Sequence, residues 1–262
     1  MITLLKLGGS LITDKNRAHT ARPEVIRRLA GEISEIWSSG QEPLIIGHGS
    51  GSFGHIPAKH YGTREGVHTP EEWKGIAEVH AEATALNRIV TDILREAGLP
   101  ILSFVPMDNI RTADSKITNW DTEELERSLD KGLIPLIFGD TIFDSRRGGT
   151  ILSTEDLFLH LCSVFSAPPR ILLAGLEEGV WHDFPNNTDL LHEISAAEPD
   201  NDQFILGSAS TDVTGGMNEK VRLMKKLIRE GKASSALIFS GTQPGNIKRA
   251  LQGSSIGTLI HN

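Results

Sequence analysis

Short apolar segments alternate with longer amphipathic segments along the chain. The apolar runs predict buried strands at 2–7, 43–47, 101–105, 133–138, 170–173, 236–239 and 256–260. Between them, helical patterns lie at 23–38, 69–97, 121–131, 154–165, 214–230 and 244–251, several of which begin with Thr, Asp or an early Pro. Strands that alternate with helices in this way predict an α/β fold with a largely parallel sheet.

Within 69–97, apolar residues recur at helical spacing, which favours a role in the core over a role in a pocket. They are Trp73, Ile76, Ala77, Leu86, Ile89, Val90, Ile93 and Leu94. Two other segments depart from the alternation. The segment 140–150 holds Gly148 and Gly149 between two β-like runs and predicts a hairpin. The polar segment 186–203 predicts an irregular surface stretch.

The chain shows no internal repeat and no long low-complexity linker. We therefore expect one domain over 1–262, with an N-terminal lobe at about 1–165 and a C-terminal lobe at about 166–262 that share one sheet.

The composition is that of an ordinary globular enzyme. Of the 262 residues, 39% are hydrophobic and 23% are charged, which argues against disorder, a collagen-like chain and a disulfide scaffold. The formal net charge of -8 gives little support to a nucleic-acid partner, so any bound anion must be held locally.

The single cysteine, Cys162, lies in an apolar run and predicts a buried thiol without an internal disulfide, as in a reducing cytoplasm. The apolar start at 1–7 is too short for a signal peptide. Because no stretch approaches the roughly 18 apolar residues of a membrane span, we expect a soluble cytoplasmic protein without a membrane partner.

A glycine-rich segment, 48–55, follows the second predicted strand, and Gly49, Gly51 and Gly54 satisfy the spacing G-x-G-x-x-G. A dinucleotide-binding unit requires this loop after the first strand, with an acidic residue at the end of the next strand about 20 residues later. Glycines also let a bound anion reach backbone N–H groups. We interpret the segment as a phosphate cradle, and a tight strand-to-helix turn remains the alternative.

Two further glycine loops lie at 6–10 and 212–217, and each has lysines close to it. The residues of these loops that could bind phosphate are Lys6, Gly8, Gly9, Ser10, Lys15, Asp212, Gly215, Gly216 and Lys220. A single lysine is most often a solvated surface charge. The repeated pairing of lysine with a glycine turn nevertheless predicts a site for a polyphosphate.

Several other chemistries lack their motifs. The sequence contains no G-x-x-x-x-G-K-[ST] loop and no protein-kinase H-R-D and D-F-G pair. It also contains no His/Cys cluster at zinc spacing and no G-x-S-x-G elbow, so we predict no protein-held metal and no serine hydrolase.

Four segments together resemble the amino acid kinase superfamily and, within it, the isopentenyl phosphate kinases. They are 6–15, 48–55, 139–140 and 212–217 with Lys220, and the resemblance runs nearly end to end. It implies a three-layer α/β/α sandwich with an acceptor-binding N-terminal lobe and a nucleotide-binding C-terminal lobe. The specific marker is Gly-Ser-Phe-Gly-His at 51–55, whose histidine separates kinases of phosphate-bearing acceptors from relatives that act on carboxylates.

The activity that this resemblance implies is ATP-dependent phosphorylation of isopentenyl phosphate to isopentenyl diphosphate, in an alternative mevalonate route to isoprenoids. ATP is expected with Mg²⁺ held largely by its phosphates, and the family implies a homodimer. An acceptor that is already a phosphate monoester needs no catalytic base.

The resemblance also implies roles for single residues. Lys6, Lys15 and Lys220 neutralise the transferring phosphoryl group, and His55 donates a hydrogen bond to the acceptor phosphate. The nucleotide phosphates are expected at Lys6, Gly8, Gly9, Ser10, Asp212, Gly215, Gly216 and Lys220. The acceptor is expected at Gly49, Ser50, Gly51, Gly54, His55, Gly139 and Glu155. Ile76, Val79 and Ala83 are candidates for an apolar tail slot, whereas His48 and His60 are expected to be structural.

Two positions depart from the family pattern. Glu155 stands where many relatives have the aspartate of Ser-Gly-Asp, which organises the lysines, so the charge remains on a longer side chain. Leu176 replaces the first aspartate of a motif in the nucleotide lobe.

Two alternative functions remain. A kinase of another phosphate or phosphonate monoester, similar to fosfomycin kinases, would share the 51–55 motif. A non-catalytic nucleotide or phosphate-metabolite sensor could use the same fold, although three retained lysines favour an enzyme.

Overall fold

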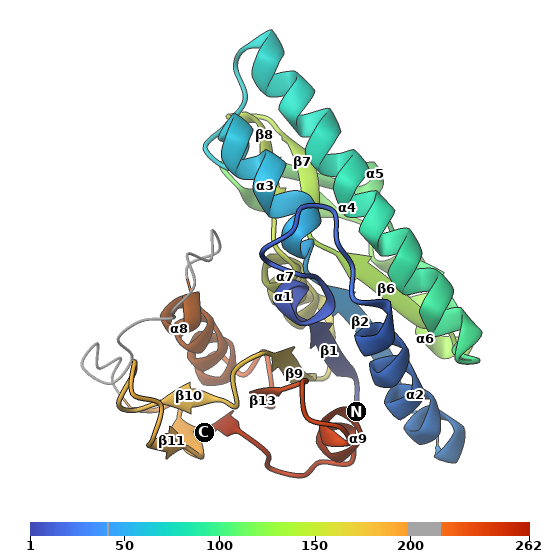
Figure 1. Cartoon of the computed structure of the whole chain (residues 1–262), viewed down its shortest axis with the longest axis vertical. Helices are drawn as coiled ribbons and strands as arrows, with labels where there is room; N and C mark the ends of the chain where they lie inside the picture. Colours follow the sequence, from blue (N-terminus) through green and yellow to red (C-terminus); the bar gives the residue numbers. More distant parts are fainter. Residues whose placement is uncertain (41, 199–215) are drawn as a thin grey trace.

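The computed structural model describes residues 1–40, 42–198 and 216–262. Its main sheet has eight strands in the order β12-β14-β13-β9-β1-β2-β6-β3 (Figure 1). In this order the strands are Glu193–Ser195, Thr258–His261, Ser235–Ser240, Arg170–Gly175, Thr3–Leu7, Leu44–His48, Ile134–Phe138 and Ile101–Ser103. All neighbours in this sheet are parallel except β13 and β14, which confirms the expected largely parallel sheet.

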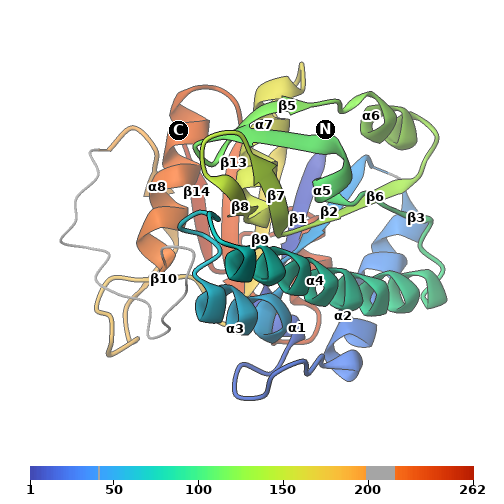
Figure 2. The ribbon, with the colours of Figure 1, turned by 90° about the horizontal axis from the view of Figure 1, so that it is seen from above.

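Helices cover both faces of this sheet. Successive residues of a strand point to opposite sides, so the apolar strands present an apolar surface on each face that the helices bury. In β1, Leu5 and Leu7 pack in one apolar cluster and Leu4 in the other. The first cluster includes helices α1 (Gly9–Ile12), α2 (Pro23–Ser39), α3 (Gly51–Tyr61), α4 (Pro70–Glu96) and α9 (Asn246–Leu251). The second includes α6 (Glu123–Asp130), α7 (Thr154–Val164) and α8 (Gly216–Arg229). Figure 2 shows α1 to α4 on the side opposite α6 and α7, as the three-layer prediction requires.

The helix α3 was not expected from the sequence, which suggested a loop at 48–55. Pro57 lies inside this helix, and proline ordinarily disrupts a helix interior. The first residue, Gly51, has a left-handed φ of 50°, and the helix ends at Gly62, which has a φ of 61°. The marker at 51–55 is therefore the beginning of a helix that follows β2 after a very short turn.

The polar segment 186–203 is only partly irregular. Its described part contains β11 (Leu190–Leu191) and β12, and β12 pairs with β14 at the edge of the main sheet. The strand β11 pairs with β10 (Val180–Trp181) in a small ribbon. Backbone pairing at the sheet edge thus determines the structure of a segment whose side chains suggested a loop.

A second sheet, in the order β5-β4-β7-β8, lies beside α4 and the short helix α5 (Pro106–Asn109). Its strands are β4 (Ile110–Ala113), β5 (Lys116–Trp120), β7 (Asp140–Asp144) and β8 (Gly148–Leu152). The strands β7 and β8 form the hairpin that the sequence predicted. The hairpin of β4 and β5 was missed, because its turn uses Asp114 and Ser115, at φ 53° and 60°, instead of glycine.

The buried carboxylate of Asp144 joins the turns of these two hairpins. It accepts backbone N–H groups of Asp114 at 3.0 Å, Ser115 at 2.8 Å, and Arg146 and Arg147 at 2.9 Å. Burial would raise the pKa of Asp144, but these backbone hydrogen bonds outweigh it and hold the pKa well below its usual range. The ionised carboxylate is therefore a structural part of the second sheet.

Asp144→Ala is expected to lower the free energy of unfolding by about 2–3 kcal/mol at pH 7, because it leaves four partly buried N–H donors without their charged acceptor. Since the folded-state pKa is depressed, this stabilisation is present above the unfolded-state pKa of about 3.9 and is lost as the pH falls below it. Urea unfolding at pH 7 and at lower pH measures the difference. Asp92→Ala, which removes an exposed partner of Arg88, is the control; equal stability of the two variants would contradict this role of Asp144.

Candidate active site

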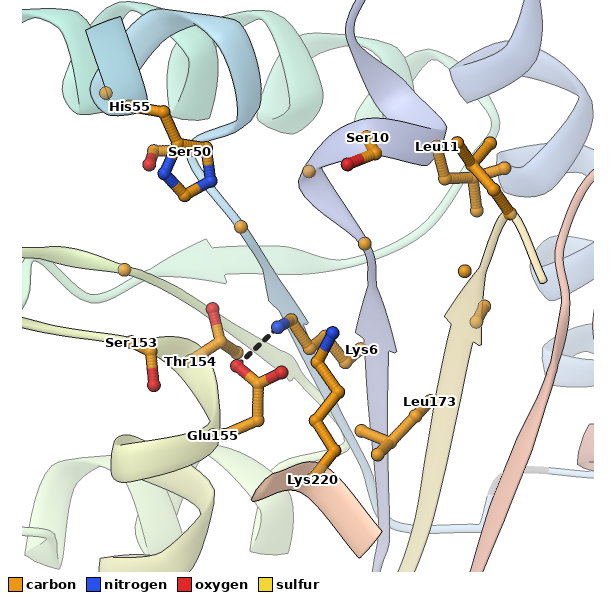
Figure 3. A pocket seen from close by; sticks show the side chains of 18 of the residues that line it. Lys6, Ser10, Leu11, Ser50, His55, Ser153, Thr154, Glu155, Leu173 and Lys220 are labelled. Atoms are coloured by element: carbon orange, nitrogen blue, oxygen red, sulfur yellow. Dashed lines mark ion pairs between the residues drawn. The ribbon is translucent and has the colours of Figure 1, made fainter. Parts of the chain in front are cut away.

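A pocket of about 410 Å³ lies where β1, β2, β6 and β9 reach their carboxyl ends. This edge of a parallel sheet is the usual place for ligands in α/β folds. Most of the residues singled out in the sequence line it: Lys6, Gly8, Gly9, Ser10, Lys15, Gly49, Ser50, Gly54, His55, Gly139, Glu155 and Lys220. The fold thus brings the first two glycine loops and the lysines to one place (Figure 3).

The remaining predicted site residues that the structure describes are not among those that line the pocket. Gly51 is buried and is not among the residues that line the pocket. Gly216 begins α8, whose residues Met217 and Lys220 line the pocket, but Gly216 is not among the lining residues. Asp212 and Gly215 lie outside the described residues.

Lys6 reaches the pocket because of its position in β1. The alternation that turns Leu5 and Leu7 toward α2 and α4 turns Lys6 to the opposite face, toward α7 and α8. There its ammonium forms an ion pair with Glu155, and both side chains are largely buried. Figure 3 shows Lys220 extending from α8 toward the same point.

Glu155 is ionised in this arrangement. Burial raises the pKa of Glu155, but the charges of Lys6 and Lys220 outweigh burial and keep the pKa below its usual range. One carboxylate therefore faces two ammonium groups, which leaves a positive charge at the base of the pocket. An incoming polyphosphate can be bound by these same ammonium groups.

The start of α7 fixes the position of Glu155. Ser153 and Asp156 form a capping box, in which each side chain accepts the other residue's backbone N–H group. The hydroxyl of Thr154 donates to the carbonyl of His48 at 2.7 Å, which ties α7 to the end of β2. The longer carboxylate at 155 thus still meets the lysines.

The glycines at 9, 49 and 51 let two loops pack backbone against backbone. A Cβ on Gly9 would lie 2.5 Å from the Gly51 nitrogen, and a Cβ on Gly49 would lie 3.0 Å from the Gly9 nitrogen. At Gly51 a Cβ would meet the Thr13 hydroxyl at 2.1 Å. The G-x-G spacing in 48–55 is therefore explained by contact with the first glycine loop, without a dinucleotide.

Some backbone N–H groups of the glycine loops already donate to carbonyl oxygens within the fold, so they are not available to bind an anion. The N–H groups of Gly8, Gly49 and Gly54 donate to the carbonyls of Ala174, Leu7 and Ser50 at 2.8, 3.2 and 3.3 Å. Within the described chain, no such acceptor is found for the N–H groups of Gly9, Ser10, Ser50 and Gly51. Of these four residues, Gly9, Ser10 and Ser50 line the pocket, so their N–H groups, at the starts of α1 and α3, are available to a phosphate.

His55 lies on the first turns of α3 and lines the pocket beside Ser50 (Figure 3). Its ring is on the α3 side of the pocket, while Lys6 and Lys220 are on the side of α7 and α8. Both the partial positive charge of the α3 N-terminus and an imidazole N–H favour an anion here. The pocket therefore has two separate sites for negative charge. One is formed by His55 and the start of α3, and the other by the ammonium groups of Lys6 and Lys220.

Sequence reasoning missed several lining residues. Arg64 follows α3, and Asp140 starts β7, directly after Gly139. Among the tail candidates, only Val79 lines the pocket, together with Ala58 and Ile151. No local pattern distinguishes these apolar residues from core residues. The apolar lining on the β9 side consists of Leu173, Ala174, Leu176, Met217, Ile238 and Phe239.

The two histidines expected to be structural do lie outside the pocket lining. His48 is fully buried, with its Nε2 atom 3.1 Å from the side-chain amide oxygen Oδ1 of Asn87, and burial lowers the pKa of His48. His60 lies exposed on α3, with its ring edge against Tyr61. Cys162 is buried, as expected, and burial raises its pKa to about 12.

The described residues contain no cluster of three or more His, Cys, Asp or Glu side chains that could hold a metal ion. No helix among them is both long and apolar enough to cross a membrane.

Comparison with known proteins identifies the family. The model of the amino acid kinase family matches residues 1–240. The chain belongs to the amino acid kinase family. An isopentenyl phosphate kinase of Methanothermobacter thermautotrophicus is 33% identical over 268 residues, which cover 98% of either chain.

Solved structures of amino acid kinases agree in fold. The protein is similar to an X-ray structure of isopentenyl phosphate kinase, with a TM-score of 0.81 and 28% sequence identity. The match covers 99% of this chain and 100% of the other chain. An isopentenyl phosphate kinase in a substrate complex has a TM-score of 0.79 at 25% identity, with 100% of both chains covered. The expected amino acid kinase-like fold is confirmed.

Proposed function

We propose that this protein transfers the γ-phosphoryl group of ATP to isopentenyl phosphate, giving isopentenyl diphosphate and ADP. The observation that carries the proposal is the placement of His55 and the α3 N-terminus in one pocket with Lys6, Lys220 and Glu155. The first group suits a phosphate acceptor, and the second suits the charge of a transferring phosphoryl group. The isopentenyl phosphate kinase relatives support this acceptor.

The residues divide into two sets along the pocket. On the acceptor side, His55 and the N–H group of Ser50 would hold the phosphate, and Ala58, Val79 and Ile151 would contact the five-carbon tail. Apolar contact suits a tail that has no hydrogen-bonding group. On the other side, the N–H groups of Gly9 and Ser10 would approach the γ-phosphoryl group.

The chemistry needs positioning and charge neutralisation rather than a base, because a phosphate acceptor is already ionised. Lys6 and Lys220 would stabilise negative charge as it shifts between the two phosphates. Lys15, which is exposed at the pocket, would add a third positive charge.

ATP would occupy the side of the pocket near β9, where the lining is largely apolar. On this side, the first glycine loop packs closely against the end of β9 because residue 8 is glycine: a Cβ on Gly8 would lie 2.9 Å from the Ala174 carbonyl oxygen. The carboxylate of Glu155 is engaged by Lys6. We therefore infer that Mg²⁺ comes with the nucleotide and is held largely by its phosphates.

A cytoplasmic location is a further proposal, and the family resemblance adds three others. They are a homodimer, an acceptor-binding N-terminal lobe at about 1–165 and a nucleotide-binding C-terminal lobe at about 166–262. Light scattering of the purified protein tests the dimer.

The test of the function is ADP release from MgATP with isopentenyl phosphate, fosfomycin, glutamate and N-acetylglutamate offered separately. Turnover confined to isopentenyl phosphate is expected. Turnover of fosfomycin alone would move the assignment to a phosphonate kinase. ATP binding without turnover of any of the four acceptors would instead favour a sensor.

A further inference from the structure

A partly buried ion pair lies at the acceptor side of the pocket, outside the roles assigned above. His80 on α4 places its Nδ1 atom 3.0 and 3.1 Å from the two carboxylate oxygens of Asp140, the first residue of β7. The Asp140 side chain is 0% exposed, whereas the His80 side chain is 30% exposed. The carboxylate is therefore shielded from water, and its partner reaches the surface.

Asp140 is close to the proposed phosphate position. It lines the pocket together with Gly139, whose N–H group donates to the carbonyl of His48 at 3.2 Å, next to Gly49. It also pairs with Leu152, another lining residue, across the β7–β8 hairpin. This carboxylate thus belongs to the wall that faces the N-terminus of α3.

Without a neighbouring positive charge, the Asp140 carboxylate would repel a negatively charged acceptor and weaken its binding. A phosphate monoester carries close to two negative charges at neutral pH, and repulsion between charges is weakly screened at a buried site. His80 forms an ion pair with Asp140, whose carboxylate also accepts the backbone N–H group of Thr141 at 2.8 Å. The charge of His80 therefore decides how strongly Asp140 repels an anion.

The surroundings of His80 favour its charged form. The hydrogen bond to Asp140 raises the pKa of His80, burial acts in the opposite direction, and the charge of Asp108 on α5 raises it further. In the second sheet, β7 and β8 contact α4: β7 carries Asp140 and Asp144, and β8 carries no ionisable side chain.

We propose that His80 is a positioning residue that neutralises Asp140 and thereby sets the affinity of the pocket for a doubly charged phosphate acceptor. The identity of that acceptor rests on the proposed function, whereas the neutralisation of Asp140 by His80 does not depend on it. The pair acts on anion binding, and Lys6 and Lys220 act on phosphoryl transfer.

The test compares His80→Gln, Asp140→Asn and the double variant by calorimetric titration with isopentenyl phosphate. His80→Gln is expected to raise the Kd about tenfold, because it removes the positive charge that faces the Asp140 carboxylate. Asp140→Asn is expected to keep the Kd within about twofold, and the double variant should return close to the wild-type value. In steady-state assays, KM for the acceptor should change with little change in kcat.

A merely structural role predicts another pattern. If the pair only holds β7 against α4, both single variants lose affinity and the double variant is no better than His80→Gln. That result, or an unchanged Kd in His80→Gln, would overturn the proposal. Arg88→Gln removes a positive charge from the exposed side of the same helix and is the matched control. Its Kd, and the Kd of every variant for ATP, should stay at the wild-type value.

A second probe, inorganic phosphate, separates this inference from the proposed function. If the wild type binds phosphate but does not phosphorylate isopentenyl phosphate, the proposed function fails, and the order of Kd values for phosphate still tests His80. If the wild-type pocket binds neither phosphate nor its monoesters, both proposals are overturned.

Discussion

Lys6→Ala is expected to lower kcat for phosphoryl transfer by about 100-fold or more, since removal of one group that stabilises transition-state charge has an effect of this size. Lys6 lies at the base of the pocket, and its ammonium is held by Glu155 before any substrate binds. Such preorganisation means that the charge need not be repositioned during the reaction. The effect should therefore fall on kcat more than on the KM values.

Loss of Lys6 also changes the state of Glu155, which must be separated from catalysis. In Lys6→Ala the buried carboxylate keeps the electrostatic influence of Lys220 but loses its ion pair. Breaking a buried pair is itself destabilising. The double variant Lys6→Ala with Glu155→Gln removes this penalty, so it should recover thermal stability without recovering kcat.

The measurement is kcat at saturating MgATP and isopentenyl phosphate, with the Tm of each variant as a check on folding. Lys226→Ala is the matched control, because Lys226 is an exposed lysine of α8 paired with Glu230. It should keep wild-type turnover. A kcat for Lys6→Ala within about threefold of the wild type would contradict transition-state stabilisation by this residue.

The layered fold could be predicted because each strand and helix carries its own local pattern. In β1, the alternation that places Leu5 and Leu7 on one face also places Lys6 on the other. Together with the rule that ligands meet the carboxyl ends of parallel strands, this is enough to bring Lys6 and the glycine loops together. The capping sequence at Ser153 likewise marks the start of α7, which carries Glu155.

The elements that were missed depend on contacts that the local sequence does not express. The helix α3 contains Pro57 and starts with glycines, so its sequence suggests a loop, yet Phe53 packs into the core. The turn at Asp114 and Ser115 is held by Asp144, about 30 positions away, in place of the glycines that the rule expects.

Long-range pairs at the site were beyond sequence reasoning for the same reason. His80 and Asp140 are 60 positions apart, and neither residue stands in a pattern that names the other. The hydrogen bonds that engage the N–H groups of Gly8 and Gly49 come from neighbouring strands, so a glycine motif alone cannot show which donors remain available. Motifs predicted where the pocket lies, and the tertiary structure determines which atoms in it can act.

His55→Ala is expected to lower kcat/KM for isopentenyl phosphate by about 100-fold, because it removes the donor that we propose for the acceptor phosphate. The fold should tolerate the change, since the ring is only half-buried and lies on the pocket side of α3. His55→Gln keeps an N–H donor at this position and should recover part of the loss. Nucleotide binding, measured by titration with ATP, should be unchanged in both variants.

The control for this experiment is His60→Ala, which removes an exposed histidine from the same helix. Its kcat/KM should equal that of the wild type. If His55→Ala turned over isopentenyl phosphate normally, the N-terminus of α3 alone would suffice to hold the acceptor, and the histidine of the marker would have no part in the reaction. If instead ATP binding fell together with acceptor turnover, the nucleotide and the acceptor would share this side of the pocket. The division of the site between His55 and the lysines would then be wrong.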